Sequence, residues 1–537
     1  MSKWLLPLVC AVLLVPLAVT DVPPLLDYPN HLARAVILAS AGSDAVLSRM
    51  YSPHWAIIPD LGVDLVLPPL LQVLPVHVAG RIVVGVALLL PVLGTVAYSR
   101  ASFRTPAAWP LASALVAYNA TFLLGFLNFV ASIGIALLFG ASWIAWRDRY
   151  PTQVVAATWI GTIALFFCHL MGLLFFFVLI VGHELDQLLT NPCDGQRCPS
   201  PQPPPARGGG VGFAVRSRFR SASGRRYVLG KRIGAVVLIA AAPLTLYFLS
   251  PLEPLSDAVE WTSAIDKTRQ LVLPFANYIL PLDILTACLV AAFLLGCVAT
   301  GRCRIARANG FVLVFAMIGF LAAPWAIKGT YFVDTRFVIL LGFLLFAAVL
   351  PVGLTRPAAI SAVCVFTGLF AIRMIVVGYA WHEHERDLNE LRVVIASVQP
   401  GERVMTVEVS PKAAPDYWRH VPLSRVLSLG LRLDSHLPAL LLIEHHAYWP
   451  FLFDNPSQQP VRTLPPYNVL AEHADTVTSH RAITVPGQVD LCGYDHLLLL
   501  DAGGQPDLAH FAADRLALVA QRDIAALFRV RPGACLQ

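Results

Sequence analysis

The stretch AGRIVVGVALLLPVLGTVAY, residues 79–98, holds twenty residues, of which only Arg81 is charged. An α-helix of about twenty apolar residues can cross the hydrocarbon core of a bilayer, which is roughly 30 Å thick. The stretch therefore predicts a transmembrane helix. Similar runs recur along most of the chain, and they decide the fold class.

The amino-acid composition also indicates a membrane protein. Of the 537 residues, 57% are hydrophobic and only 13% are charged, and the mean hydropathy is +0.67. We therefore expect a polytopic α-helical membrane protein with about eleven transmembrane helices. The eleven predicted spans are residues 4–20, 79–98, 107–124, 127–146, 153–168, 170–187, 233–250, 279–300, 310–327, 337–355 and 358–380.

The first twenty residues allow two interpretations. They carry one lysine, an apolar core and the small-residue sequence AVT before Asp21, which is also the pattern of a cleaved signal peptide. An uncleaved first span is the favoured interpretation. Both place Asp21 and the residues after it on the far side of the membrane.

Positive charge marks one side of the predicted topology. Basic residues cluster after the even-numbered spans, and loops rich in Lys and Arg stay in the cytoplasm. An odd number of spans then places the C-terminus outside, in the inner (plasma) membrane of a bacterium. The basic residues are Arg100, Arg104, Arg147, Arg149, Arg207, Arg216, Arg218, Arg220, Arg225, Arg226, Lys231, Arg232, Arg302, Arg304, Arg307 and Arg356.

Two domains are predicted. Residues 1–380 form the transmembrane domain, with an outer loop at 21–78 and a cytoplasmic linker at 191–229, where CPSPQPPPARGGG cannot pack a core. Residues 381–537 form an extracytoplasmic α/β domain. In it YDHLLLLDA and DIAALFRVR predict strands, and DLAHFAADRLALVA predicts a helix. The ten cysteines show no paired framework.

The outer loop contains LLDYPNHLARAVIL, residues 25–38, directly after the first span. Helical spacing places Asp27, His31 and Arg34 on one face, with Asp27 as N-cap. The apolar positions of the other face predict a helix lying at the membrane interface. The alternative is structural, with Asp27 only capping the helix and Arg34 reaching toward lipid headgroups. Those apolar positions are Leu32, Ala35, Val36 and Ala39.

Other polar residues gather on the same predicted outer side. Lys328 and Arg336 are cations there, against the prevailing charge rule, and are suited to bind a lipid phosphate. Lys267 lies in another outer loop. His169 and the loop asparagines Asn119 and Asn128 are candidates for the site or, alternatively, interhelical polar groups.

This arrangement resembles the GT-C superfamily of integral-membrane glycosyltransferases, which use polyprenyl-phosphate sugars or related lipid-linked donors. The resemblance rests on a first span followed by a long outer loop with an early acid, many spans, late outer cations and a C-terminal outer domain. It implies Asp27 as catalytic base and Lys328 or Arg336 as phosphate ligands. Many members carry two adjacent acids, whereas Tyr28 follows Asp27 here, which leaves the base and any divalent metal open.

The predicted function is transfer of a sugar from a polyprenyl-phosphate donor to an extracytoplasmic glycan, lipid or protein acceptor. Asp27 and His31 are the predicted catalytic residues, and no metal ligands, nucleotide or nucleic acid are expected. A transporter of lipid-linked sugars is one alternative, although Arg373 is the main charge inside a span. A non-catalytic envelope assembly subunit is the other. The predicted substrate-binding residues are Arg34, His169, Lys267, Lys328 and Arg336.

Overall fold

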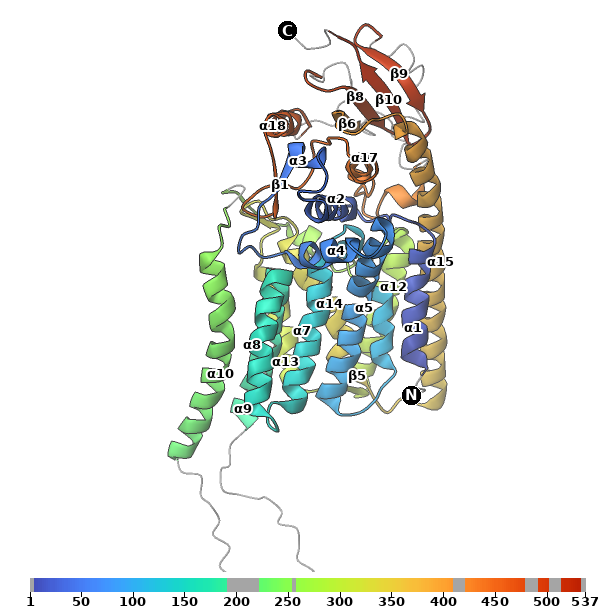
Figure 1. Cartoon of the computed structure of the whole chain (residues 1–537). Helices are drawn as coiled ribbons and strands as arrows, with labels where there is room; N and C mark the ends of the chain where they lie inside the picture. Colours follow the sequence, from blue (N-terminus) through green and yellow to red (C-terminus); the bar gives the residue numbers. More distant parts are fainter. Residues whose placement is uncertain are drawn as a thin grey trace, which may run out of the picture.

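The fold is that of a computed structural model (Figure 1). It describes residues 4–190, 222–253, 257–408, 421–478, 491–501 and 513–532. Most of the predicted linker, 191–221, lies outside these residues. Its last part, 222–229, belongs to helix α10 (Ala222–Leu249), so the helix begins earlier than expected.

Seven helices are long and apolar enough to cross a membrane, which supports a polytopic helical protein. Each coincides with one of the predicted spans. The long α15 also continues past the expected domain boundary at 380. The seven are α5 (Val76–Phe103), α7 (Leu127–Trp146), α8 (Pro151–Cys168), α9 (Leu170–Thr190), α10, α12 (Leu280–Ala299) and α15 (Arg356–Ile395).

The other four predicted spans form shorter helices, so the count of eleven stays a prediction. The span expected at 107–124 is not continuous, because Asn119 accepts a hydrogen bond from the Phe122 amide and starts a new helix. The short elements are α1 (Leu5–Leu14) with η1 (Val15–Ala18), η2 (Trp109–Val116) with α6 (Ala120–Leu123), α13 (Arg307–Ala322) and α14 (Val333–Ala347).

The loops that the charge rule assigns to the outer side meet at the end of the bundle next to the C-terminal region (Figure 1). Strand β2 (Val259–Glu260) pairs there with β4 (Ala326–Ile327). At the opposite end β3 (Cys303–Ile305) pairs with β5 (Val349–Pro351). The grouping of loops therefore agrees with the sequence. Which end faces out of the cell stays a prediction.

The C-terminal region holds a four-stranded sheet of order β6-β8-β10-β9, in which β6 and β8 are parallel. The strands are β6 (Val404–Glu408), β8 (His496–Leu500), β9 (Leu516–Gln521) and β10 (Ala525–Val530). Two short helices, α17 (Leu440–His445) and α18 (Tyr467–Thr478), accompany the sheet. The helix predicted over 507–520 is wrong at its C-terminal part, because pairing with β10 makes 516–521 a strand.

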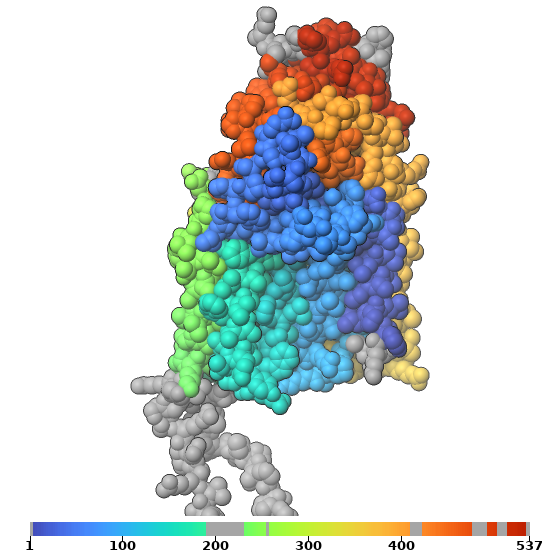
Figure 2. Space-filling view, viewed as in Figure 1, coloured from blue at the N-terminus to red at the C-terminus, as the bar shows by residue number. Residues whose placement is uncertain are grey.

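The first outer loop lies between the bundle and the C-terminal region (Figures 1 and 2). It contains α2 (Tyr28–Ala39), α3 (Leu47–Met50) and α4 (Gly62–Leu71). Strand β1 (Tyr51–Pro53) pairs with β7 (Val461–Thr463) of the C-terminal region. The side chain of Asn30 on α2 also bonds the backbone of Phe451 and Phe453, at 3.0 and 2.8 Å.

The expectation that α2 lies at the membrane interface is wrong. Leu32 and Ala35 have no exposed surface and Val36 is 5% exposed, so the apolar face packs into protein. The C-terminal region covers this helix from above, which the amphipathic pattern of α2 could not reveal. Cys492 is disulfide-bonded, a pairing that the cysteine spacing did not indicate.

Candidate functional site

A tight turn before α7 organises the candidate site. Gly125 has a φ of +81°, and a Cβ there would lie 2.6 Å from the backbone nitrogen of Asp27, so only glycine fits. The amide of Asp27 donates to the carbonyl of Leu124 at 3.1 Å. The turn thereby fixes the start of α2. Polar side chains gather around this turn in two groups.

The first set of side chains, called here the loop group, comprises Asp27, His31, Arg34, Asp64 and His436. Arg34 donates to both carboxylate oxygens of Asp64 at 2.9 Å, and the two side chains are 1% and 0% exposed. Its Nη2 also lies 2.8 Å from Nδ1 of His31. A guanidinium only donates, so this ring nitrogen accepts and carries no proton.

His31 is therefore a neutral base in this group. Its pKa lies well below the usual 6.5 because of burial first, and then because of the positive charge of Arg34 and the nearby His436. The predicted shared face of His31 and Arg34 is confirmed by their contact. Arg34, however, was expected to bind substrate, and the structure instead buries its charge against Asp64.

Asp27 stands at the N-cap position of α2, but its side chain makes no capping hydrogen bond, contrary to expectation. Its Oδ1 lies 3.1 Å from Nδ1 of His436, without the geometry of a hydrogen bond. His436 comes from the C-terminal region and packs edge-on against Trp449 and Phe453. The sequence carried no signal for His436, because nothing local links it to a residue some 400 positions earlier.

The second set of side chains, called here the bundle group, comprises Asp60, His169 and Arg336. Asn128 clamps the loop that carries Asp60, since its amide nitrogen donates to the Asp60 carbonyl and its oxygen accepts from the Val63 amide at 2.8 Å. Asn128 is thus a structural residue rather than a ligand. The clamp holds Asp60 in a left-handed conformation, with a φ of 66°.

His169 faces Asp60 from the turn between α8 and α9. Its Nδ1 accepts a hydrogen bond from the Met171 amide at 2.9 Å, so the ring proton resides on Nε2. Nε2 lies 3.7 Å from Oδ2 of Asp60. The prediction that His169 belongs to a polar site on this side agrees with the geometry, although its nearest charged partner was not foreseen.

Asp60 has the properties of a functional carboxylate. Burial among protein atoms raises its pKa to about 6, against the lowering effects of Arg336 and of the Leu170 amide. Yet its side chain keeps 47% of its surface accessible. Its Oδ1 is buried without a hydrogen-bond partner, while the rest of the side chain is still reached by solvent.

Arg336 is held by aromatic rings instead of by an acid. Its guanidinium carbon lies 5.7 Å from the ring centres of both Phe126 and Phe129. Within the described residues no carboxylate lies within 4.0 Å of it, and its buried Nε has no hydrogen-bond partner. A cation with an unused donor near a partly exposed carboxylate is suited to bind an anion.

The two predicted lysine ligands lie elsewhere. Nζ of Lys267 donates to the carbonyls of Phe320 and Ala323, at 2.8 and 3.0 Å, and lies 3.3 Å from the Asp334 carboxylate. These partners use its three donors to hold the end of α13. Lys328 is exposed in the following turn, at a φ of 53°. No contact between described residues joins either lysine to the bundle group.

Comparisons with protein-family models, with curated proteins and with solved structures return no match to this chain. Function is therefore inferred from the side chains of the two groups. An accessible carboxylate of raised pKa can accept a proton near neutral pH. A guanidinium without a carboxylate partner can hold a phosphate. Across the described ranges, no three His, Cys, Asp or Glu side chains are placed to hold a metal ion.

Proposed function

We propose that the chain is an integral-membrane glycosyltransferase that moves a sugar from a polyprenyl-phosphate donor to an extracytoplasmic acceptor. The observation that carries the proposal is the bundle group. It joins an accessible acid of raised pKa, Asp60, to Arg336, a cation with no acidic partner within salt-bridge distance in the described chain. The group lies where apolar helices meet the outer loop, a place that both a lipid and a polar acceptor could reach.

The roles follow from charge. Asp60 takes the proton from an acceptor hydroxyl, whose oxygen forms a bond to the anomeric carbon of the donor sugar. The bond from that carbon to the lipid phosphate breaks, and the phosphate leaves with the electron pair. Arg336 stabilises the charge that develops on the phosphate. The Nε2–H of His169 orients the Asp60 carboxylate. General-base help of this kind contributes about 10²–10⁴-fold to the rate.

Asp60 is favoured over Asp27 as the base, although the family resemblance pointed to Asp27. The Asp27 side chain is 16% exposed and faces His436, whereas that of Asp60 is 47% exposed and lies near the free cation. In this proposal Asp27 and His31, from the loop group, contact the acceptor or the donor sugar.

The proposed orientation places the C-terminal region outside the cytoplasm, in the inner membrane of a bacterium. The positive charge of the opposite loops supports this orientation. The disulfide at Cys492 supports it independently, because disulfides persist mainly in oxidising compartments such as the periplasm. Alkaline phosphatase fused after residue 532 should be active, and an inactive fusion would contradict the orientation.

The transporter alternative is less well supported. Arg373, the main charge within a predicted span, donates to Asp283 at 2.8 Å, and both side chains are buried. It therefore forms part of the packing between α12 and α15 and does not line an open path. Transport of a lipid-linked sugar would remain the explanation if the purified protein bound the donor but never consumed it.

The test is turnover of a labelled polyprenyl-phosphate sugar by the purified full-length protein. We expect Asp60→Asn to lower the rate by about 10²-fold or more. Asp27→Asn should stay within a few-fold of wild type. Asp266→Asn is the matched control, since Asp266 is an exposed acid at the same end of the bundle. If only Asp27→Asn lost activity, Asp27 would be the catalytic base. If the wild-type protein showed no turnover, the glycosyltransferase proposal would be refuted.

A further inference from the structure

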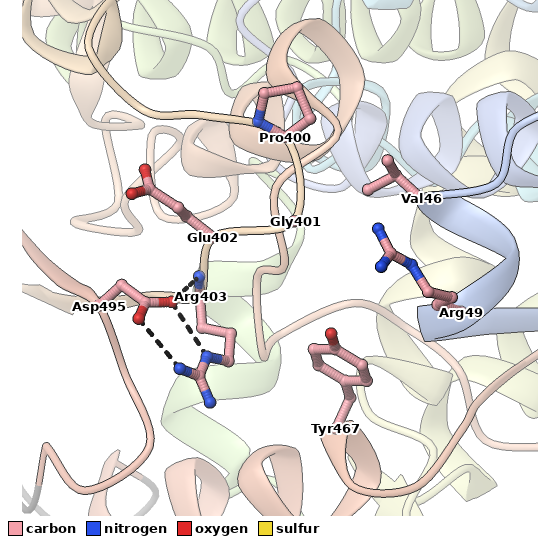
Figure 3. Close-up of a pocket in the computed structure, with 8 residues that line it drawn as sticks. All are labelled: Val46, Arg49, Pro400, Gly401, Glu402, Arg403, Tyr467 and Asp495. Atoms are coloured by element: carbon pink, nitrogen blue, oxygen red, sulfur yellow. Dashed lines mark hydrogen bonds and ion pairs between the residues drawn. The ribbon is translucent and has the colours of Figure 1, made fainter.

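A polar cavity lies at the seam between the first outer loop and the C-terminal region (Figure 3). Its volume is about 410 Å³, within the usual 300–1,000 Å³ of small-molecule sites. α3 supplies Arg49 to one wall, the turn just before β6 supplies Glu402 and Arg403 to the other, and Tyr467 lies at the base in this view. None of these residues belongs to the loop group or the bundle group.

One wall of the cavity is fixed by internal bonds. Arg403 donates from Nε and Nη2 to the two carboxylate oxygens of Asp495, each at 3.0 Å, and its backbone amide donates to the same carboxylate at 2.8 Å. The charges of this pair cancel. Oε2 of Glu402 accepts from the Gln399 amide at 2.7 Å and lies 3.6 Å from Nδ1 of His496, and the carboxylate points away from Arg49 and Tyr467 (Figure 3).

The opposite wall and the base carry unused groups. Within the described residues, neither the guanidinium of Arg49 nor the hydroxyl of Tyr467 forms an ion pair or a hydrogen bond. Both point into the cavity (Figure 3). The ring of Tyr467 packs against Tyr448, with centroids 4.9 Å apart, so the hydroxyl is held in place. Among the described residues, the cavity thus offers one unpaired cation and one unused hydroxyl.

We propose that this cavity binds a small anionic sugar. A guanidinium suits the negative group, whether carboxylate or phosphate, by paired hydrogen bonds. The hydroxyl of Tyr467 suits a sugar hydroxyl. An apolar ligand would displace water from Arg49 and Tyr467 and form no hydrogen bonds in its place. The charges of Arg403 and Asp495 cancel, and the carboxylate of Glu402 points away from Arg49 (Figure 3), so Arg49 is the group that selects for negative charge.

The site joins two parts of the chain that are far apart in sequence. Arg49 directly precedes Met50 and strand β1, which pairs with β7, while Arg403 belongs to the C-terminal sheet region. An occupant that contacts both walls therefore stabilises the docking of the C-terminal region on the outer loop. This binding does not require glycosyl transfer at Asp60, so the two proposals can fail separately.

The test is calorimetric titration of the full-length protein in detergent, without any lipid-linked donor. Glucuronic acid, glucose 6-phosphate and glucose are the three probes. We expect at least one of the two anionic sugars to bind about tenfold or more tightly than glucose, because hydrogen bonds to a charged partner are the stronger ones. The preferred anion shows whether the natural ligand carries a carboxylate or a phosphate. Equal binding of all three probes, or no binding, would overturn the proposal.

Variants locate the binding. Arg49→Gln should abolish the tenfold preference for the anionic sugar, and Tyr467→Phe should weaken every probe that binds. Arg462→Gln is the matched control, since Arg462 is an exposed arginine on β7 that does not line the cavity. The same titrations with Asp60→Asn protein should match wild type. An anion preference that survives Arg49→Gln, or that is lost equally in Arg462→Gln, would show that the cavity is not the site.

Discussion

Arg34 and Arg336 lie in the two side-chain groups at the same end of the helical bundle, yet their surroundings differ. Arg34 is buried and donates to both oxygens of Asp64 at 2.9 Å. Arg336 lies between two phenylalanine rings, with no carboxylate within 4.0 Å in the described chain. The comparison shows that a charged side chain near a site can bind a ligand only where no neighbouring side chain of opposite charge already pairs with it. Arg34 is a structural residue and Arg336 a candidate ligand.

The largest expected effect comes from breaking the buried pair. Asp64→Asn leaves the Arg34 guanidinium uncompensated in a place where it has 1% exposure. Removing one partner of a buried ion pair costs about 3–5 kcal/mol. We expect a large fall in the thermal unfolding midpoint, measured in detergent. A midpoint close to that of wild type would show that Arg34 reaches water and that the two arginines are alike.

A paired replacement controls for lost shape. Arg34→Met combined with Asp64→Leu removes both charges and keeps much of the volume, and such replacements are often neutral for stability. The double variant should therefore be more stable than Asp64→Asn alone. A double variant as unstable as the single one would mean that packing, and not the unpaired charge, causes the loss.

The next effect concerns Arg336. Arg336→Gln breaks no ion pair within salt-bridge distance, because the nearest acid, Asp60, feels its charge only at longer range, so we expect a smaller loss of stability than for Asp64→Asn. Affinity for a polyprenyl-phosphate sugar should fall about tenfold to a hundredfold, since bonds to a charged group contribute about 1.5–3 kcal/mol. Binding of a labelled donor to the folded variant is the measurement. Undiminished donor binding would refute the role of Arg336.

A smaller effect is expected from pH acting on Asp60. Its carboxylate is the active form, so kcat/KM should rise about tenfold per pH unit up to a midpoint near pH 6. Stability should change in the opposite sense. The folded pKa of about 6 exceeds the reference value of 3.8, so the folded state holds the proton more tightly and loses this contribution as pH rises through 6. Asp60→Asn should remove the stability trend.

The smallest effect is expected at the contact between Asp27 and His436. Both side chains are partly exposed, at 16% and 20%, and such pairs contribute less than about 1 kcal/mol. His436→Gln should leave the unfolding midpoint nearly unchanged and lower turnover only a few-fold. A loss of turnover as large as that of Asp60→Asn would instead place His436 among the catalytic residues and shift the site to the loop group.

The sequence by itself determined the membrane-spanning helices and the grouping of loops. Span 127–146 coincides with α7 because twenty uncharged, mostly apolar residues in a row have few alternatives to a helix in a membrane. The shared face of His31 and Arg34 also followed from helical spacing, which is a local property. The sequence failed where the chain carried a local breaker, as at Asn119, or where a neighbouring strand overrode a helical pattern, as at 516–521.

Only the tertiary structure decided which charged residues are free. Arg34 and Arg336 look equivalent in the sequence, and the difference arises because Asp64 meets one and Phe126 and Phe129 meet the other. The burial of α2 and its contact with His436 depend on a region some 400 residues later. Hydropathy and periodicity depend only on residues that are close together in the sequence. Pairing of charges depends on side chains that folding brings together, and it therefore cannot be deduced from either.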